Sequence, residues 1–335
     1  MSVRDLHAGP AQPTVRAGSE ASARTRLIVL SIVLVVAIAC FLTLFVRGSF
    51  DFALPRRATM VGAMAVAAFA QGVGTVVFHT VTQNRILTPS IMGFDSLYTL
   101  MQTLLVWFFG GAVIAETEGL TKVVAQTALM VAFATILYRW LFSGRFGSLY
   151  LLLLVGVVLG MAFDSLSSFL QRLLDPTDYD MLSVQLFGRL SGVDSTYLPL
   201  AFLVCGAVGV IFWRRRHTLD ALLLGRETAM SIGVNHKREL TLMLVLIALL
   251  VAFSTALVGP LTFYGFLVAT LAYQVTGSYR HEYVMPMAFL LGMLTLVGGQ
   301  FVMQHIFSAG GFLTVIIEFA GGILFLYFLL RRRRL

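Results

Sequence analysis

The segment Leu240–Val258, LTLMLVLIALLVAFSTALV, decides the fold class of this chain, because it is a long apolar run without a single charged residue. An α-helix rises about 1.5 Å per residue, so about 20 such residues cross the roughly 30 Å of hydrocarbon in a bilayer. A strand of a membrane β-barrel would instead alternate between polar and apolar residues. The segment therefore predicts a transmembrane helix.

Similar segments recur along the whole chain. Of its 335 residues, 58% are hydrophobic and 12% are charged, and the mean hydropathy is +0.88, which is too apolar for a water-soluble core. We therefore predict an all-α polytopic membrane protein with about ten transmembrane helices and both termini in the cytoplasm. The predicted spans are 27–46, 58–80, 95–115, 121–141, 149–171, 196–213, 239–258, 262–276, 283–303 and 312–330.

The first 26 residues precede the predicted transmembrane domain, 27–335. They are rich in Ala, Ser, Arg and Pro, and we expect a disordered cytoplasmic tail. The first apolar block lacks a small-residue cleavage site, so it is expected to be a span and not a removed signal peptide.

The distribution of Lys and Arg predicts the orientation in a bacterial inner membrane. With a cytoplasmic N-terminus, most of the 24 basic residues fall on the inside, including the arginines at 214–216 and 331–334. The net charge of +8 is thus explained by topology, and basic residues spread over short loops do not indicate nucleic-acid binding. The residues that fall outside are Arg47, Arg56, Arg57, Lys122, Arg172 and Arg189.

The sequence has no pattern that predicts catalysis or a metal site. Cys40 and Cys205 both lie in predicted spans, where packing is their expected role. The six His residues show no ligand spacing, and there is no Walker A, Gly-x-Ser-x-Gly or Ser/His/Asp pattern. We therefore predict a chain that is not an enzyme and holds no cofactor. Active transport would draw on an ion gradient or a partner ATPase.

The longest cytoplasmic loop, 214–239, reads RRRHTLDALLLGRETAMSIGVNHKRE. Two stretches that are too short to span a bilayer, 219–224 and 226–232, are separated by Gly225 and followed by Gly233. Short amphipathic helices with charged flanks suit docking into a groove on a soluble partner. They equally suit a position on the lipid surface, so both interpretations stay open at this point.

Five separated motifs resemble the permeases of iron-chelate and vitamin B12 importers, the FecCD-type family of ABC transporters. The resemblance covers the chain from about residue 27 to its end, on a matching hydropathy profile. The motif in the cytoplasmic loop, LGRETAMSIGV at 224–234, looks like the family's coupling loop. The others are LPR at 54–56, NRILTPSIMGF at 84–94, QLFGRLSGVD at 185–194 and GPLTFYGF at 259–266.

The resemblance implies a type II ABC importer permease that pairs with an identical or homologous second permease. It also implies two ABC ATPase subunits that bind ATP and Mg, an extracytoplasmic binding protein, and a ferric siderophore as substrate. The motifs at 84–98 and 264–274 look more like the catecholate-siderophore branch than the cobalamin branch. The residues that it assigns to ATPase coupling are Leu224, Gly225, Arg226, Glu227, Ala229, Met230, Gly233 and Val234.

Two outer arginines are candidates for docking the binding protein. Arg56 and Arg57 have no topological reason to lie outside, and such charges steer association with an acidic partner. In the related family an arginine after Leu-Pro contacts the binding protein, and Arg56 matches that position. Two further family arginines are not carried over, because Ala53 and the region near 303–305 stand in their place. Snorkelling toward lipid headgroups is the alternative for Arg57.

Polar residues inside two spans are candidates for the pathway or its gate, because ionisable groups at this depth usually face a cavity or another helix. Glu318 lies in the last span, and a structural, hydrogen-bonded acid is the alternative for each carboxylate. Gly156 and Gly160 form a GxxxG pattern, for which we expect ordinary packing. The candidates in the fifth span are Asp164, Ser165, Ser167 and Ser168.

Pro and Gly open the third and eighth spans from opposite sides, which suggests inverted repeats of roughly 58–171 and 239–330. Two other classes of function also remain. An ion-coupled transporter would use Asp164 and Glu318 as ion sites, and an intramembrane enzyme would pair one of them with His79. Neither class explains the loop at 219–234.

Overall fold

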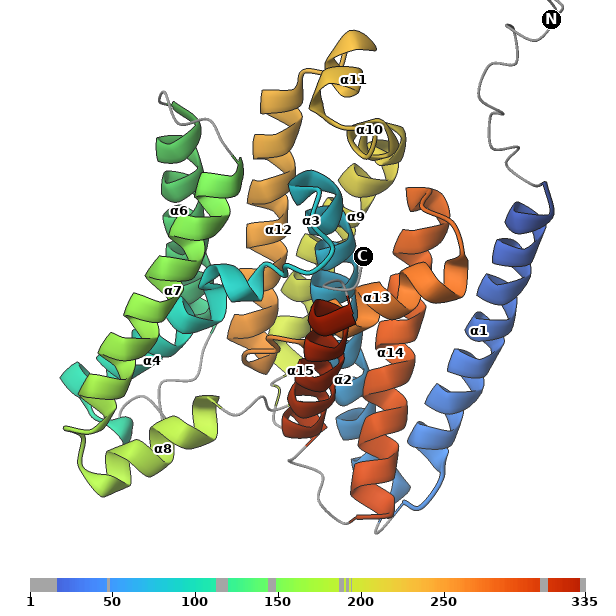
Figure 1. Cartoon of the computed structure of the whole chain (residues 1–335). Coiled ribbons are helices and arrows are strands. Elements are labelled where there is room, and N and C mark those ends of the chain that lie inside the picture. Colours follow the sequence, from blue (N-terminus) through green and yellow to red (C-terminus); the bar gives the residue numbers. More distant parts are fainter. Residues whose placement is uncertain are drawn as a thin grey trace, which may run out of the picture.

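The computed structural model describes residues 17–46, 49–112, 120–143, 149–186, 190, 193, 195–307 and 313–331 of the chain, and these residues form a bundle of helices (Figure 1). Its α-helices are α1 (Ala17–Thr43), α2 (Phe50–Ala67), α3 (Gly74–Thr82), α4 (Phe94–Phe109), α6 (Leu120–Ser143), α7 (Leu149–Gln171), α8 (Pro176–Leu186), α9 (Leu198–Arg214), α10 (Arg216–Leu222), α11 (Arg226–Ser231), α12 (His236–Val258), α13 (Tyr264–Thr276), α14 (His281–His305) and α15 (Leu313–Arg331). Shorter elements are the π-helical η2 (Ala68–Val73) and the 3₁₀ turns η3 (Ser90–Met92) and η4 (Ser195–Tyr197).

The predicted spans coincide with these helices, although the second, 58–80, covers α2, η2 and α3, and the all-α fold class is confirmed. In the described part of the chain, six helices are long and apolar enough to cross a membrane. The apolar parts of α6 and α15 are shorter, as are α4 and α13. Helix α1 begins at Ala17, so the last residues of the expected tail are helical, while residues 1–16 lie outside the described residues.

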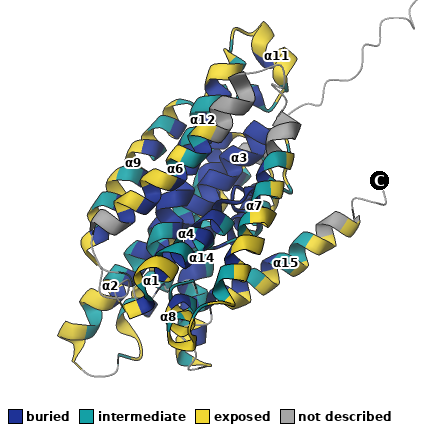
Figure 2. Ribbon diagram, turned by 90° about the vertical axis from the view of Figure 1, so that its left-hand side faces the viewer, coloured by how far each residue is buried: buried dark blue, intermediate teal, exposed yellow. Residues whose placement is uncertain are grey.

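The second span is one helical unit, 50–82, that runs through the centre of the bundle. In its most apolar stretch 78% of the residues are buried, against 11% for α1 and 17% for α7. Figure 2 shows the difference, with dark blue around α3 and yellow on the outer helices. The peripheral faces of α1 and α7 are therefore available to lipid or to a second subunit.

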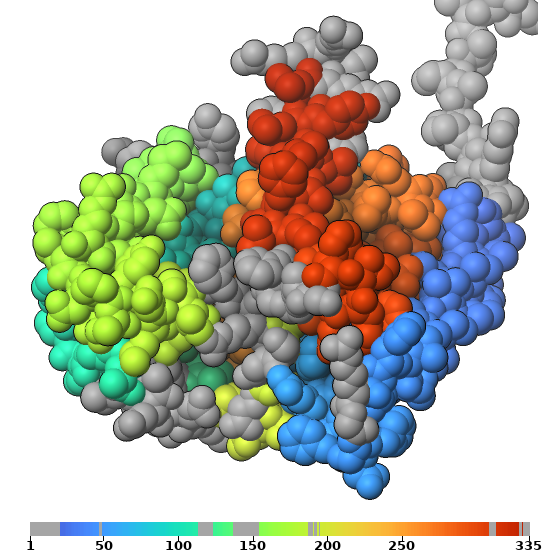
Figure 3. All heavy atoms as spheres, turned by 90° about the horizontal axis from the view of Figure 1, so that it is seen from below, coloured from blue at the N-terminus to red at the C-terminus, as the bar shows by residue number. Residues whose placement is uncertain are grey.

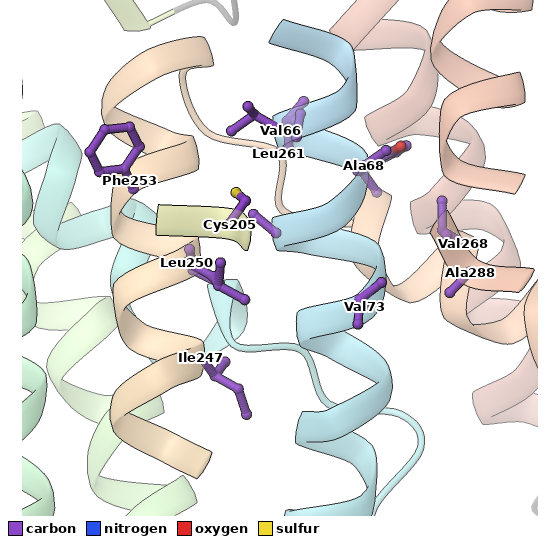
Figure 4. Close-up of a cluster of buried hydrophobic side chains, with 14 of the residues drawn as sticks. Val66, Ala68, Val73, Cys205, Ile247, Leu250, Phe253, Leu261, Val268 and Ala288 are labelled. Carbon is purple, nitrogen blue, oxygen red and sulfur yellow. The ribbon is translucent and has the colours of Figure 1, made fainter. Parts of the chain in front are cut away.

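The unit 50–82 is interrupted by η2, where the backbone makes a π-helical turn. A Cβ atom at Gly72 would lie 3.0 Å from Cγ1 of Val268 and 3.3 Å from the carbonyl oxygen of Ala288. Small residues at such contacts let membrane helices pack closely, where no hydrophobic effect drives association. Figure 4 shows this core, with Leu250 of α12 and Cys205 on one side of the central helix and Val268 and Ala288 on its other side; both cysteines are free.

The GxxxG pair has the packing role expected of it. Gly156 and Gly160 of α7 lie against the turn that precedes α4, and a Cβ atom at Gly160 would be 3.0 Å from Cα of Gly93. Gly93 itself has φ +91°, a conformation that favours glycine. The contact holds α4 and α7 together, so this half of the bundle is built on backbone-to-backbone approach.

The connections lie at the two ends of the bundle. Helices α10 and α11 form the tip at one end in Figure 1, and α8 lies across the other end, which Figure 3 views directly. The positive-inside rule makes the α10–α11 end cytoplasmic. Irregular segments follow α3 and α12, and Gly93 and Gly259 within them have φ +91° and +90°. The inverted repeat stays a prediction.

Candidate functional site

The cytoplasmic loop forms two short helices whose turns depend on glycine. Gly225 (φ +93°) separates α10 from α11, and Gly233 (φ +91°) follows α11, so both have a conformation that residues with a side chain rarely adopt. The carbonyl of Gly225 accepts from the amide of Ala229 at 3.0 Å, and the amide of Val234 donates to the carbonyl of Ala229 at 3.0 Å. These turns and hydrogen bonds give the loop a defined backbone shape.

One face of this loop is apolar and exposed. Leu224, Met230 and Ile232 are 62%, 45% and 59% exposed, whereas Ala229 is fully buried. Arg226 and Glu227 are exposed beside them, as is Gly233, while Gly225 and Val234 are half-buried. We name the exposed set Leu224, Arg226, Glu227, Met230, Ile232 and Gly233 the coupling surface. It lies at the tip of the bundle, beyond the end of α12 (Figure 1).

The other face of the loop is fixed to the bundle. Leu219 and Leu222 are buried, and the side-chain amide of Gln83 donates to the carbonyl of Leu222 at 2.6 Å. Gln83 itself ends α3 in the left-handed region, with φ +53°. On the other side, Arg215 forms an ion pair with Glu239 of α12. These contacts tie α10 and the residue before it to α3 and α12.

A polar network connects α10 to two further helices. One carboxylate oxygen of Asp220, Oδ1, accepts from the backbone amide of His281 at 2.9 Å and lies 2.6 Å from Nδ1 of its ring. The other ring nitrogen, Nε2, lies 2.8 Å from the hydroxyl of Thr80. His281 is the first residue of α14 and Thr80 belongs to the last turn of α3. Three helices therefore meet at one imidazole ring.

The charge of Asp220 is stabilised by this arrangement. Partial burial raises the pKa of its carboxyl, but the side-chain and backbone hydrogen bonds of His281, with the charges of His281 and His217, bring that pKa below its ordinary value. A carboxylate at the start of α14 also compensates the positive end of the helix dipole and an amide that has no partner within the helix.

At the outer end, the two candidate arginines have different environments. Arg56 is exposed, whereas Arg57 is only 7% exposed. The guanidinium of Arg57 donates to the carbonyls of Phe41, Leu44 and Phe45 at 2.7, 2.7 and 3.2 Å. Arg57 therefore satisfies the carbonyls at the C-terminal end of α1. This geometry argues against a direct role of Arg57 in docking and leaves Arg56 as the candidate.

The candidates in α7 do not share one face. Asp164, Ser165 and Ser168 are exposed, whereas Ser167 is 1% exposed and donates to the carbonyl of Phe163 at 2.7 Å. Ser165 likewise donates to a carbonyl of its own helix, at 2.8 Å. The exposed groups lie on the side of α7 that is open to lipid or a second subunit.

Asp164 and Glu318 both lie close enough to Asp95 for their charges to interact. Asp95 is 7% exposed at the start of α4, and it accepts from the hydroxyls of Thr262 and Thr255 at 2.9 and 3.4 Å. In the described residues, no group of three or more acids, His or Cys has the arrangement of a metal site. Asp95 is thus an additional candidate for the pathway.

His79 does not form the pair that an intramembrane enzyme would need. Its ring is 2% exposed and stacks on Tyr273, with the ring centroids 6.0 Å apart. The charged side chain that interacts electrostatically with the His79 ring is Arg85, and not Asp164 or Glu318.

Comparisons with known proteins agree with this architecture. A model of the FecCD transport family matches residues 27–331. The petrobactin import system permease protein FatC of Bacillus anthracis is 43% identical over 287 residues, which are 86% of this chain and 81% of FatC. The petrobactin import system permease protein YclO of Bacillus subtilis (strain 168) is 39% identical over 300 residues, 90% of this chain and 95% of YclO.

The fold also matches a solved structure, a metal-chelate type ABC transporter in an inward-facing conformation. The TM-score is 0.76 at 21% sequence identity, and the match covers 92% of this chain and 99% of the other. At this identity the likeness concerns the fold.

Proposed function

We propose, from the premise that this chain belongs to the FecCD transport family, that it is the permease subunit of an ABC importer for ferric siderophores and that α10 and α11 connect it to the ATPase. The observation that carries the proposal is the coupling surface. The apolar residues of this surface are exposed at the cytoplasmic tip. Two glycines determine the backbone shape of the loop, and the opposite face of the loop is hydrogen-bonded to the bundle. Such a surface suits a groove on a soluble protein.

The substrate class follows from the two relatives, whose names both refer to petrobactin import. We propose ferric petrobactin, a catecholate siderophore, as the cargo. The cargo brings its iron in chelated form, so the pathway needs shape and charge and no metal ligands of its own. Asp95, Asp164 and Glu318 are the side chains that would set the charge of that pathway.

The remaining subunits complete the importer. ATP and Mg are bound by two ATPase subunits, and their closure moves α10 and α11 as a lever. A second permease, identical or homologous, covers the exposed face of α7 and encloses the pathway. On the outer side, Arg56 is exposed and available to an acidic residue of the binding protein, where such a charge speeds and orients docking.

Co-purification and uptake test the proposal together. The double variant Met230→Asp with Ile232→Asp places charges in the apolar part of the coupling surface. Both side chains are exposed, so we expect the fold to stay intact. We expect it to reach the membrane in normal amounts, to lose the ATPase on purification and to abolish uptake of iron-loaded petrobactin. Tyr279→Asp, 55% exposed near the same end of the bundle, is the control and should retain the ATPase.

The result that would overturn the proposal is uptake that continues without the ATPase. An ion-coupled transporter would then be favoured, and its uptake would stop when a protonophore collapses the ion gradient while ATP remains. The importer predicts the reverse response, in which depletion of ATP stops uptake and the protonophore alone does not.

A further inference from the structure

The network of Asp220, His281 and Thr80 lies where the helices α10, α14 and α3 meet. Asp220 belongs to α10, beside the coupling surface, whereas His281 and Thr80 belong to α14 and α3. Both α3 and α14 contact η2 in the centre of the bundle. Movement of α10 can therefore reach the core through this network, in addition to the apolar contacts of Leu219 and Leu222.

The geometry of the ring makes this connection stiff. His281 and Thr80 are each 1% exposed, so water has little access to the hydrogen bond between them, whereas the Asp220 side chain on the other side of the ring is 27% exposed. An imidazole is planar, and its two nitrogens lie on opposite sides, with the Asp220 carboxylate at 2.6 Å from one and the Thr80 hydroxyl at 2.8 Å from the other. Apolar contacts allow sliding, whereas two short hydrogen bonds on a rigid ring fix both distance and direction.

A second connection runs beside the first. The side-chain amide of Gln83 donates to the carbonyls of Thr80 and Leu222, at 3.2 and 2.6 Å. The end of α3 is thus bound to α10 at two points, through His281 and through Gln83. Two points of attachment resist rotation as well as translation, which a lever requires.

We propose that Asp220, His281 and Thr80 form a transmission joint, through which movement of the coupling helices tilts α3 and α14 together. The three are positioning residues, because none of them touches ATP or the siderophore in this role. The proposal rests on the proposed function, since it assumes that an ATPase moves α10 and α11. It adds to the proposed function that a variant without the joint should still hydrolyse ATP but import fewer siderophores for each ATP hydrolysed.

The experiment uses the complete importer in proteoliposomes, with ATP hydrolysis and uptake of radioactive ferric petrobactin measured on the same sample. Thr80→Val removes one hydroxyl from the joint. Thr82→Val is the matched control, because Thr82 is also buried in the last turn of α3 but its hydroxyl bonds only to the nearby carbonyls of Phe78 and Asn84. Thr80→Ser restores the hydroxyl and should restore function.

We expect Thr80→Val to lower the number of siderophores imported per ATP hydrolysed about fivefold, the equivalent of one hydrogen bond, with the ATPase still bound. Asp220→Asn should act in the same direction, and the double variant should be less than additive because both act through His281. Thr82→Val and Thr80→Ser should match the unmodified chain.

Two results would overturn the joint. In one, hydrolysis and transport fall in proportion, so that their ratio is unchanged. In the other, Thr82→Val lowers the ratio as much as Thr80→Val does. Failure of the unmodified chain to bind an ATPase or to transport with ATP would instead overturn the proposed function, and the joint with it.

Discussion

Replacing Arg57 with alanine is expected to destabilise the protein without a direct effect on docking. The guanidinium makes its three shortest hydrogen bonds to the carbonyls of Phe41, Leu44 and Phe45, at and just beyond the end of α1, and its carbon lies 5.7 Å from the centre of the Phe41 ring. The charge also compensates the negative end of the helix dipole. Without it, the carbonyl of Phe41 stays buried without a donor, while Leu44 and Phe45 are exposed and regain water.

The magnitude follows from these three contacts. A hydrogen bond to a charged group contributes about 1.5–3 kcal/mol when it is buried and less when water replaces it. One buried and two accessible contacts therefore give about 2–4 kcal/mol in total for Arg57→Ala. An unfolding entropy of about 2.1 cal/mol/K per residue, summed over the 335 residues of this chain, converts this loss into a fall in unfolding temperature of about 3–6 °C.

The assay is thermal unfolding in detergent at one fixed heating rate, since unfolding of large proteins is often irreversible. Arg57→Lys keeps the charge but loses the planar guanidinium. Its unfolding temperature should therefore lie between those of the unmodified protein and Arg57→Ala. Arg56→Ala is the matched control, with an unchanged unfolding temperature and slower association with the binding protein. The reasoning is refuted if Arg57→Ala unfolds normally and loses association, because Arg57 would then be the docking residue.

Three further predictions concern packing, charge and pH. Gly160→Val places a side chain against the backbone of Gly93, where a Cβ atom alone would already be 3.0 Å from the Gly93 Cα, so it should lower the free energy of unfolding by about 1–3 kcal/mol. Gly206→Ala, with nothing within 4 Å, should have little effect, and equal effects of the two variants would contradict the packing. Asp95→Asn keeps an acceptor for Thr262 but removes the charge, so siderophore uptake should fall while the unfolding temperature is unchanged, and normal uptake would exclude a role for that charge. Because the pKa of Asp220 is depressed, its stabilising effect is complete above the ordinary value of 3.8 and disappears as the pH falls through the lower, folded value. Asp220→Asn should therefore lower the unfolding temperature at about pH 5, and this penalty should shrink as the pH falls below 3.8; a penalty that grows on acidification would contradict this sign.

The spans and the coupling loop are predictable because the information for them is local. Apolar runs of sufficient length define helices such as α12, and glycines at 225 and 233 define the turns of the loop. Two of the chosen coupling residues nevertheless differ in position, since Ala229 is buried and Met230 is exposed. Residue type does not decide that difference, because the side of a short helix that faces the bundle depends on distant contacts.

The unpredicted features all depend on contacts between distant segments. Arg56 and Arg57 are adjacent residues of the same type, so the sequence does not distinguish them. In the fold, Arg57 is buried against the end of α1 and Arg56 is exposed. In the sequence, Asp95 is only the first residue of a predicted span. The fold brings Thr255 and Thr262 within hydrogen-bond distance of its carboxylate. The contact of Asp220 with His281 joins residues far apart in the chain, and no spacing rule predicts it.

The π-helical turn η2 has a consequence for the phase of the helix that contains it. An α-helix turns by about 100° per residue, and a π turn accommodates one additional residue without breaking the helix. Deleting one residue from 68–73 would therefore rotate α3 by about 100° relative to α2, which would carry Thr80 away from His281 of α14 and Gln83 away from Leu222 of α10. The number of residues between Phe50 and Thr82 is thus fixed by the direction in which its cytoplasmic end must point, and not only by the thickness of the membrane.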